Sequence, residues 1–107
     1  MAKPLYHPER DQIALSAVLD ALSDPIRLGI VLDLIDGAER NASWFLDRAS
    51  KTNLTYHLGR LREAGVTRTR IAGAMRMISL RRDALDARFP GLLDAVVAGA
   101  RAEQGPD

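Results

Sequence analysis

The sequence predicts a mainly α-helical domain of the α+β class, with about five helices and one two-stranded β-hairpin. Apolar residues recur at helical spacing in several segments, and capping or helix-breaking residues bound each segment. Between residues 66 and 80 the spacing changes to alternation around a short turn that contains glycine. With 107 residues, the chain suits one domain with a modest core.

The first helix is expected from residue 9 to residue 22, after an arm of residues 1–8 that contains two prolines. Glu9 and Asp11 suit the positive end of the helix dipole. Apolar side chains cover far more than one stripe, so this helix should be buried on two sides, the second one plausibly by another subunit. The arm is expected either to fold over a neighbouring subunit or to stay mobile.

A second helix is predicted from Pro25 to about Asp36. Ser23 and Asp24 supply an N-cap before a proline at the first helical position, and Gly37 ends the helix. The segment between these signals has a strongly apolar face, which indicates a core helix.

A short third helix is expected to end at Arg48, with Asn41 or Ser43 as its N-cap. It contains two adjacent aromatic residues, Trp44 and Phe45. Such a pair either lines a ligand pocket or packs in the core, and core packing is the more frequent role.

The fourth helix is predicted between Ser50, a good N-cap, and Gly65, which stands where a left-handed cap usually ends a helix. Its apolar stripe consists of Leu54, Leu58 and Leu61. The other side carries hydroxyls, an amphipathic ring and cations, which suit base edges and phosphates: Lys51, Thr52, Thr55, Tyr56, Gly59, Arg60 and Glu63. Residues 42–64 are therefore a helix-turn-helix candidate, with 50–65 as the recognition helix.

A basic β-hairpin is expected directly after this helix, over residues 66–80, with its turn at 72–74. A basic hairpin in this place is a wing, suited to contact phosphates or an adjacent minor groove. A short helical turn at 84–88 follows, and Pro90 is expected to open a final helix from Gly91 to about Ala102. The predicted domain thus spans residues 9–102, and residues 103–107 form a flexible tail.

The net charge of +1 is distributed unevenly along the chain. Residues 48–82 carry nine bases and one acid, whereas residues 1–47 sum to −4 and residues 83–107 to −3. A basic block between acidic ones is typical of a nucleic-acid-binding surface, although many charged segments are simply solvated.

Several classes of protein are not expected. The chain has no cysteine, which excludes disulfides and thiolate metal sites. Its two histidines, His7 and His57, form no recognisable ligand set, so no metal or other cofactor is expected. No paired histidines or glycine-rich phosphate loop indicate an enzyme. The lack of a long apolar run or a signal peptide favours a cytoplasmic protein without a membrane segment.

Two strings extend the pattern to a known family. Residues 21–31, Ala-Leu-Ser-Asp-Pro-Ile-Arg-Leu-Gly-Ile-Val, resemble the opening of ArsR-type winged helix-turn-helix transcriptional repressors. Residues 50–58, with Leu-Arg-Glu-Ala-Gly at 61–65, look like that family's recognition helix and its exit. The resemblance implies a homodimer through the first and last helices, whose candidate interface residues are Ile13, Ala17, Val18, Leu92, Leu93, Val96 and Val97.

The resemblance also implies roles on DNA. Base edges would be read by Lys51, Thr52, Thr55 and Tyr56, where Tyr56 stands at a position that members often give to histidine. Backbone and wing contacts would come from Ser50, Asn53, Arg60, Arg62, Arg68, Arg70 and Arg76. The wing tip, Ala72-Gly73-Ala74, lacks the acid and arginine that commonly flank its glycine, and the cysteine-based metal sites of many members are absent.

We therefore expect a DNA-binding transcriptional regulator, a repressor by resemblance, that binds a pseudo-palindromic double-stranded operator as a homodimer. The alternative is a winged-helix interaction module whose basic block binds an acidic protein without reading DNA. An organic effector, a protein partner, or no effector at all remain open.

Overall fold

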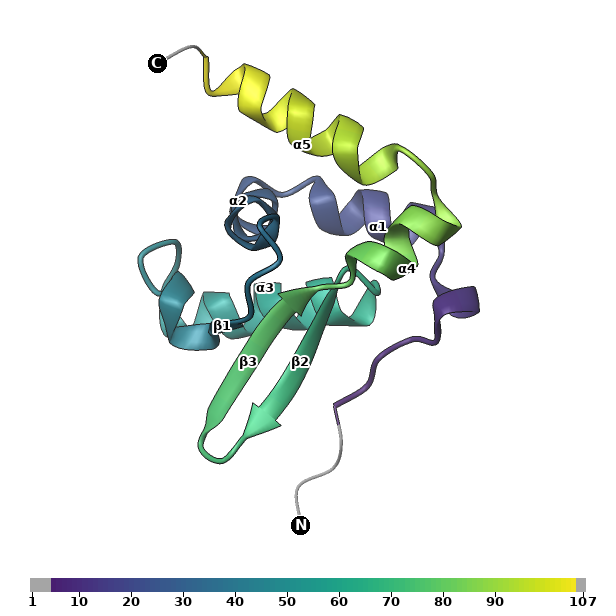
Figure 1. Cartoon of the computed structure of the whole chain (residues 1–107). Helices are drawn as coiled ribbons and strands as arrows, with labels where there is room; N and C mark the ends of the chain where they lie inside the picture. The colour runs from purple at the N-terminus through teal and green to yellow at the C-terminus, as the bar shows by residue number, and fades with distance from the viewer. Residues whose placement is uncertain (1–4, 106–107) are drawn as a thin grey trace.

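The computed structural model describes residues 5–105, which form five α-helices, two 3-10 helices and a three-stranded antiparallel sheet (Figure 1). The helices are η1 (Arg10–Gln12), α1 (Leu15–Leu22), α2 (Pro25–Leu34), η2 (Ala42–Phe45), α3 (Lys51–Glu63), α4 (Arg82–Arg88) and α5 (Leu92–Glu103). The strands are β1 (Arg40–Asn41), β2 (Thr67–Ala72) and β3 (Met75–Leu80), in the spatial order β1-β3-β2. The predicted winged helix-turn-helix architecture is confirmed.

The predicted first helix is wrong in its N-terminal half. Instead of one helix from residue 9, the short η1 and α1 are separated by extended backbone at Ile13 and Ala14. The break turns the Ile13 side chain into the core, where it is 1% exposed. It packs so closely on Gly65 that a Cβ there would lie 2.6 Å from Ile13 Cγ1. A continuous helix would not deliver Ile13 to that place.

Helix α2 begins as its sequence signals predict. The Asp24 carboxylate accepts from the amides of Ile26 and Arg27 at 2.8 and 3.1 Å, and Pro25 occupies the first turn. Burial of Asp24 opposes ionisation, but these amides and the nearby His57 and Arg27 lower the pKa of its carboxyl. The helix start is therefore held by a charged cap.

Between α2 and α3 the structure departs from expectation twice. β1, which pairs Arg40 and Asn41 with Ile78 and Met77 of β3, was not predicted. Two residues are too few to show an alternating pattern. The predicted third α-helix is the 3-10 helix η2, which ends at Phe45 in a turn instead of continuing to Arg48.

Helix α3 has the predicted bounds and caps. Ser50 Oγ accepts from the Asn53 amide at 3.3 Å, and Gly65 has a φ of +85°. The leucine stripe, Leu54, Leu58 and Leu61, is buried against the rest of the core. Packing against α1, α2 and β2 fixes α3 on the body and leaves its other side exposed.

The wing is the hairpin of β2 and β3, whose register pairs Thr67 with Leu80 and Ala72 with Met75. Gly73 and Ala74 form the turn, and Gly73 has a φ of +60°. Side chains alternate between two faces. The inner face, turned toward α3, carries Thr67, Thr69, Ile71, Arg76, Ile78 and Leu80, and the outer face carries Arg68, Arg70, Ala72, Met75, Met77 and Ser79.

The last two helices differ from prediction at their starts. α4 begins at Arg82 rather than residue 84, and α5 begins at Leu92 after Gly91, whose φ is +81°. Pro90 lies in the turn before Gly91 and does not open the helix. α5 packs on α4 at the end of the molecule opposite the wing tip (Figure 1). No helix between residues 5 and 105 combines the length and apolarity that a bilayer crossing requires.

Residues 5–8 of the arm lie against their own chain. The Thr69 amide of β2 donates to His7 Nε2 at 3.0 Å, which leaves His7 Nδ1 to donate to the Leu5 carbonyl at 3.1 Å. Arg62 of α3 donates to the Tyr6 carbonyl at 3.1 Å, and Arg81 donates to the Pro8 carbonyl at 2.8 Å. Residues 1–4 of the predicted arm and 106–107 of the predicted tail lie outside the described residues.

Candidate nucleic-acid interface

The four residues predicted to read bases share the exposed side of α3. Lys51, Thr52, Thr55 and Tyr56 are all exposed, and the Tyr56 side chain is 60% exposed. Thr55 Oγ1 donates to the Lys51 carbonyl at 2.9 Å. The Thr55 hydroxyl oxygen can therefore still accept a hydrogen bond from a ligand, and the Thr55 methyl group can still pack against one. The hydroxyl proton is already used.

The Tyr56 ring contacts His57 edge to face, with the ring centroids 5.3 Å apart. This contact leaves the hydroxyl end of Tyr56 free. An exposed helix face with an aromatic ring, two threonines and one lysine can place hydrogen-bond donors, acceptors and apolar groups in a major groove.

A buried polar network holds α3 against the junction of α1 and α2. Arg27, 7% exposed, donates through Nε to the Ala21 carbonyl at 2.7 Å and through a terminal nitrogen to His57 Nδ1 at 3.1 Å. Its other terminal nitrogen lies 3.3 Å from the Asp20 carbonyl. Because a guanidinium only donates, His57 accepts through Nδ1.

His57 is buried, and its ring nitrogen is bound by the Arg27 side chain. The role of Arg27 was not foreseen. Only the adjacency of Arg27 to the capping residues 23–25 hinted that it lies near the helix junction.

The predicted phosphate-binding arginines fall into two groups. Arg62 and Arg76 border one depression of about 140 Å³ together with Thr55, between α3 and the inner face of the wing. Ser50 and Asn53 are exposed at the N-terminal end of α3. These residues surround the base-reading candidates and can reach phosphates on either side of them.

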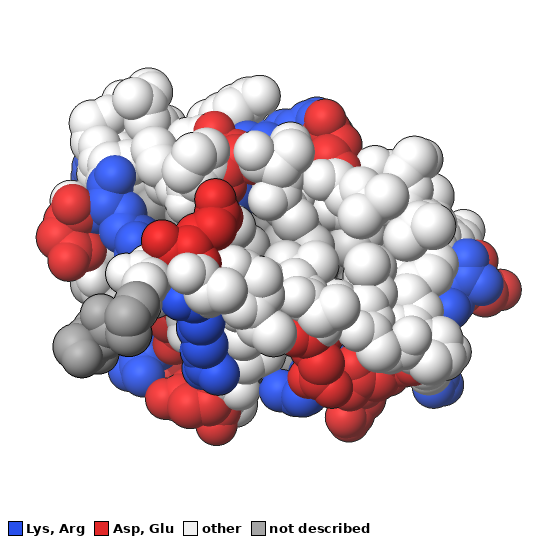
Figure 2. Space-filling view, turned by 90° about the horizontal axis from the view of Figure 1, so that it is seen from above, with Lys and Arg blue, Asp and Glu red and all other residues white. Residues whose placement is uncertain are grey.

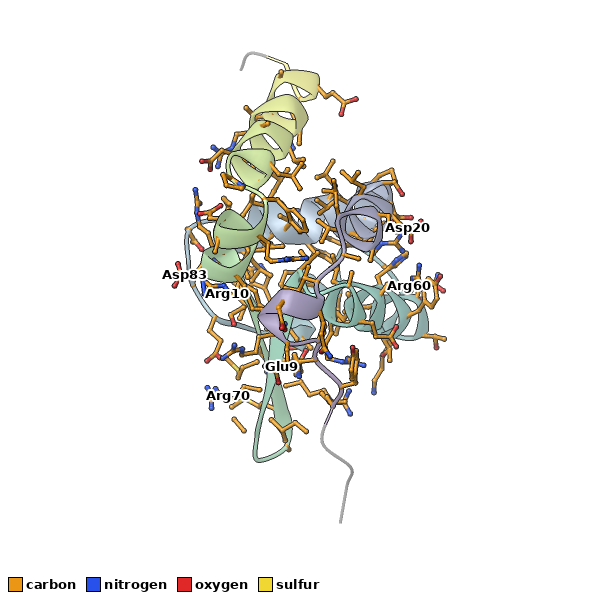
Figure 3. The ribbon with its side chains drawn as sticks, turned by 90° about the vertical axis from the view of Figure 1, so that its right-hand side faces the viewer. Glu9, Arg10, Asp20, Arg60, Arg70 and Asp83 are labelled. Carbon is orange, nitrogen blue, oxygen red and sulfur yellow. The ribbon has the colours of Figure 1, made fainter. Side chains whose placement is uncertain are left out.

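Of the other predicted arginines, two pair with acids, and Arg68 lies on the outer face of the wing. Arg60 donates to Asp20 at 2.6 Å, on the side of α3 toward α1. Arg70, on the outer face of the wing, binds both oxygens of Glu39 at 2.7 and 3.1 Å. The Arg70 hydrogen bonds lower the pKa of the Glu39 carboxyl, whose burial opposes them only weakly. Figure 3 shows Arg60 and Arg70 on different sides of the molecule.

The structure separates the two aromatic residues of η2. Phe45 is fully buried in the core, whereas Trp44 is 56% exposed and lies under the Arg40 guanidinium, 4.2 Å from its carbon. Core packing therefore describes Phe45, and a cation–π contact describes Trp44. The two side chains do not face a common space.

The predicted dimer-interface residues also divide. Ile13, Val18, Leu93 and Val97 are buried in the core of the single chain and have almost no surface left for a partner. Ala17, Leu92 and Val96 are half-buried. The exposed apolar side chains on this part of the molecule are instead Leu15 and Leu19 of α1. Figure 2 shows a broad uncharged area, with charges around its rim, on the end that carries α5.

Within residues 5–105, no group of three or more His, Cys, Asp or Glu side chains is arranged to hold a metal ion.

Comparison with known proteins gives the context of this interface. The chain is 36% identical over 89 residues to YceK of Bacillus subtilis, an HTH-type transcriptional regulator, and the match covers 80% of this chain and 88% of YceK. No protein-family model matches the chain.

Two solved structures have the same fold. The transcriptional repressor BigR from Xylella fastidiosa is 26% identical, with a TM-score of 0.57 over 70% of this chain and 85% of BigR. An ArsR family transcriptional regulator is 19% identical, with a TM-score of 0.62 over 92% of this chain and all of its own. These relatives are regulators of transcription. The chain belongs to the ArsR family of winged helix-turn-helix transcriptional regulators.

Proposed function

We propose that this protein is a sequence-specific repressor that binds a pseudo-palindromic DNA operator as a homodimer. The observation that carries the proposal is the exposed side of α3, where the base-reading candidates lie together beside Arg62 and Arg76. The N-terminal half of α3 enters the major groove, and the inner face of the wing follows the adjacent backbone.

Base choice in this proposal comes from side chains with different chemistry. Lys51 donates to guanine acceptors, and Tyr56 presents a ring and a hydroxyl. Thr55, whose proton is engaged by Lys51, accepts from a base amino group or packs its methyl on that of thymine. Lys51, Arg62 and Arg76 supply the charge that neutralises phosphates.

The homodimer rests on the apolar side of α1 and α5. Leu15 and Leu19 are 45% and 47% exposed, and a Cβ added to Gly99 of α5 would meet nothing within 4 Å. In the proposed dimer these surfaces meet the same surfaces of a second copy across a twofold axis. Such a dimer places two α3 helices on half-sites about one helical turn apart.

The repressor role is supported by the likeness to BigR, which is itself a transcriptional repressor. Binding across a promoter, or beside it, blocks the polymerase by occupancy alone. No effector chemistry is needed for that step.

Selection of bound fragments from the source genome, repeated over a series of salt concentrations, tests the proposal. We expect recovery of a few fragments that share an inverted repeat. Equal retention of all fragments would instead favour a winged helix that binds an acidic protein.

A further inference from the structure

A groove of about 730 Å³ lies between η1, the start of α4 and the ends of the two wing strands. Four arginines, two acids and Ser79 contribute to its lining, and Figure 3 shows Glu9, Arg10 and Asp83 around it. The arginines are Arg10, Arg68, Arg81 and Arg82. This volume falls in the range of small-molecule sites, roughly 300–1,000 Å³.

Two of these arginines are open to a ligand. The side chains of Arg10 and Arg68 make no hydrogen bond or ion pair with any residue in the part of the chain that the structure describes. Arg82, in contrast, is committed to Asp94 at 2.6 Å and to Asp86 at 3.5 Å. Arg68 projects from the outer face of β2, away from α3.

Arg81 is incompletely paired. One terminal nitrogen donates to the Pro8 carbonyl at 2.8 Å, but its buried Nε–H has no acceptor among residues 5–105. Burial lowers the pKa of the Arg81 guanidinium, and the positive charge of Arg68 lowers it further. An anion bound beside the two guanidinium groups would offset the repulsion between them and would favour the charged form of each.

A second hollow continues from the first. It has a volume of about 420 Å³, runs along the arm at His7 and Pro8, and shares Glu9, Arg68 and Arg81 with the groove. Arg68 and Arg81 therefore stand between two adjoining spaces. A ligand held there has room on both sides of its charged group.

We infer that this groove binds a small anionic molecule, a carboxylate or a phosphate monoester, whose oxygens are held by Arg68 and Arg81, with Arg10 at the rim. Glu9 and Asp83 on the same lining disfavour a continuous polyanion such as a DNA backbone, whereas a compact anion fits between the arginines. The groove thus serves as an effector site distinct from the α3 surface.

The site has a regulatory consequence that rests on the proposed function. Arg81 donates to the Pro8 carbonyl of the arm, and Arg68 belongs to the wing, so a ligand held by both arginines connects the two segments. Because the wing is proposed to touch DNA, an occupied groove changes the affinity for the operator.

The test is an NMR titration of the ¹⁵N-labelled full chain with inorganic phosphate and, separately, with succinate, at constant ionic strength set by chloride. We expect saturable shifts in the amides of residues 79–83 and in the Nε–H signal of Arg68. Arg68→Gln should weaken binding at least about tenfold, the effect of losing one hydrogen bond to a charged group. Arg101→Gln, which removes an equal charge from exposed α5, should leave it unchanged.

Arg81→Gln is a second variant, used only if its thermal unfolding matches that of the parent chain, and it should also weaken binding. Equal affinities for the parent chain and Arg68→Gln would overturn the inference, as would shifts confined to the N-terminal half of α3. Competition of a random DNA duplex with phosphate for residues 79–83 would assign the groove to the DNA backbone instead. The titrations with phosphate and with succinate contain no DNA. Their result is therefore independent of whether the chain binds an operator.

Discussion

Thr55 stands at the centre of the proposed reading surface, and its hydroxyl proton is already used within α3. Thr55→Val keeps the methyl group and removes the acceptor, whereas Thr55→Ser keeps the acceptor and removes the methyl group. One of the two should weaken operator binding by about 1–3 kcal/mol, the size of one good base contact, and spare non-specific binding. Fluorescence anisotropy on operator and random duplexes separates these effects. Equal losses on both duplexes would rule out base reading by Thr55.

Arg27 links the junction of α1 and α2 to α3 through its hydrogen bonds to the Ala21 carbonyl and His57. Arg27→Leu removes its hydrogen bonds to Ala21 and His57 and leaves their acceptors buried. The free energy of unfolding should fall by about 1.5–3 kcal/mol, the range for hydrogen bonds to a charged group. Urea unfolding measures the change, and exposed Arg101→Leu is the control, expected within about 0.5 kcal/mol of the parent. Similar stabilities for the two variants would contradict this role of Arg27.

Residues with local signals were predictable, and residues with distant partners were not. All the signals of helix α3 lie within 16 residues of sequence, namely Ser50, the leucine stripe and Gly65. The structure confirms that helix. The bond between Arg27 and His57 joins residues 30 apart, and no spacing rule reveals it. The sequence shows that the basic side chains gather between residues 48 and 82, but which of them already pair with acids became visible only in three dimensions.

The same division holds for helices and strands. The break at Ile13 arises because the core needs that side chain beside Gly65, which the composition of residues 9–22 does not show. β1 forms because its backbone pairs with the edge of β3, and its two residues have no sequence pattern of their own. The wing, whose strands pair with each other across a two-residue turn, was predicted correctly because its partners are adjacent in sequence.

The arm segment at residues 5–8 should respond to pH through His7. Burial lowers its pKa from the ordinary value of 6.5, and the charges of Arg62, Arg81 and Arg68 add to this effect against the hydrogen bond to Leu5. The folded pKa is depressed, so docking is complete above pH 6.5 and weakens as pH falls below it, because a protonated Nε2 cannot accept from Thr69.

Hydrogen exchange of the Thr69 amide, corrected for its intrinsic rate, measures this docking. We expect protection at pH 7.5 that declines below pH 6.5, the ordinary histidine value. In His7→Phe the Thr69 amide should exchange fast both at pH 7.5 and below pH 6.5. Protection in His7→Phe equal to that of the parent would show that His7 does not hold the arm.

Helix α1 should carry the contact between subunits through its exposed leucines. Leu19→Glu places a charge on the proposed interface without touching the core, since Leu19 is 47% exposed. We expect a monomer with unchanged helix content. Light scattering after size exclusion gives the mass, and Trp44→Glu, at a residue 56% exposed on η2, is the control that should remain dimeric. A dimeric Leu19→Glu would place the interface elsewhere.

The charge distribution of the whole molecule predicts how binding depends on salt. The chain has nine bases between residues 48 and 82, but four of them (Arg48, Arg60, Arg70 and Arg82) pair with acids, and Arg68 faces away from α3. If Lys51, Arg62 and Arg76 of each subunit contact phosphates, log K falls with log salt at a slope of roughly −5, at about 0.9 per phosphate.

Two wing variants provide the matched comparison for that slope. Arg76→Gln on the inner face should reduce it by about 2 for a dimer, and Arg70→Gln on the outer face should leave it unchanged. A steeper slope of roughly −16 would mean that all nine bases of each subunit contact DNA.

The docked arm has a consequence for aggregation. β2 is one of the two outer strands of the sheet, and an uncovered outer strand is a template on which another chain can add a strand. His7 and Thr69 are 62 residues apart, so this cover forms only after a long loop has closed. Chains that have formed the hairpin but not docked the arm therefore expose β2 during folding. We therefore expect docking of residues 5–8 to reduce pairing of β2 with a strand of another chain.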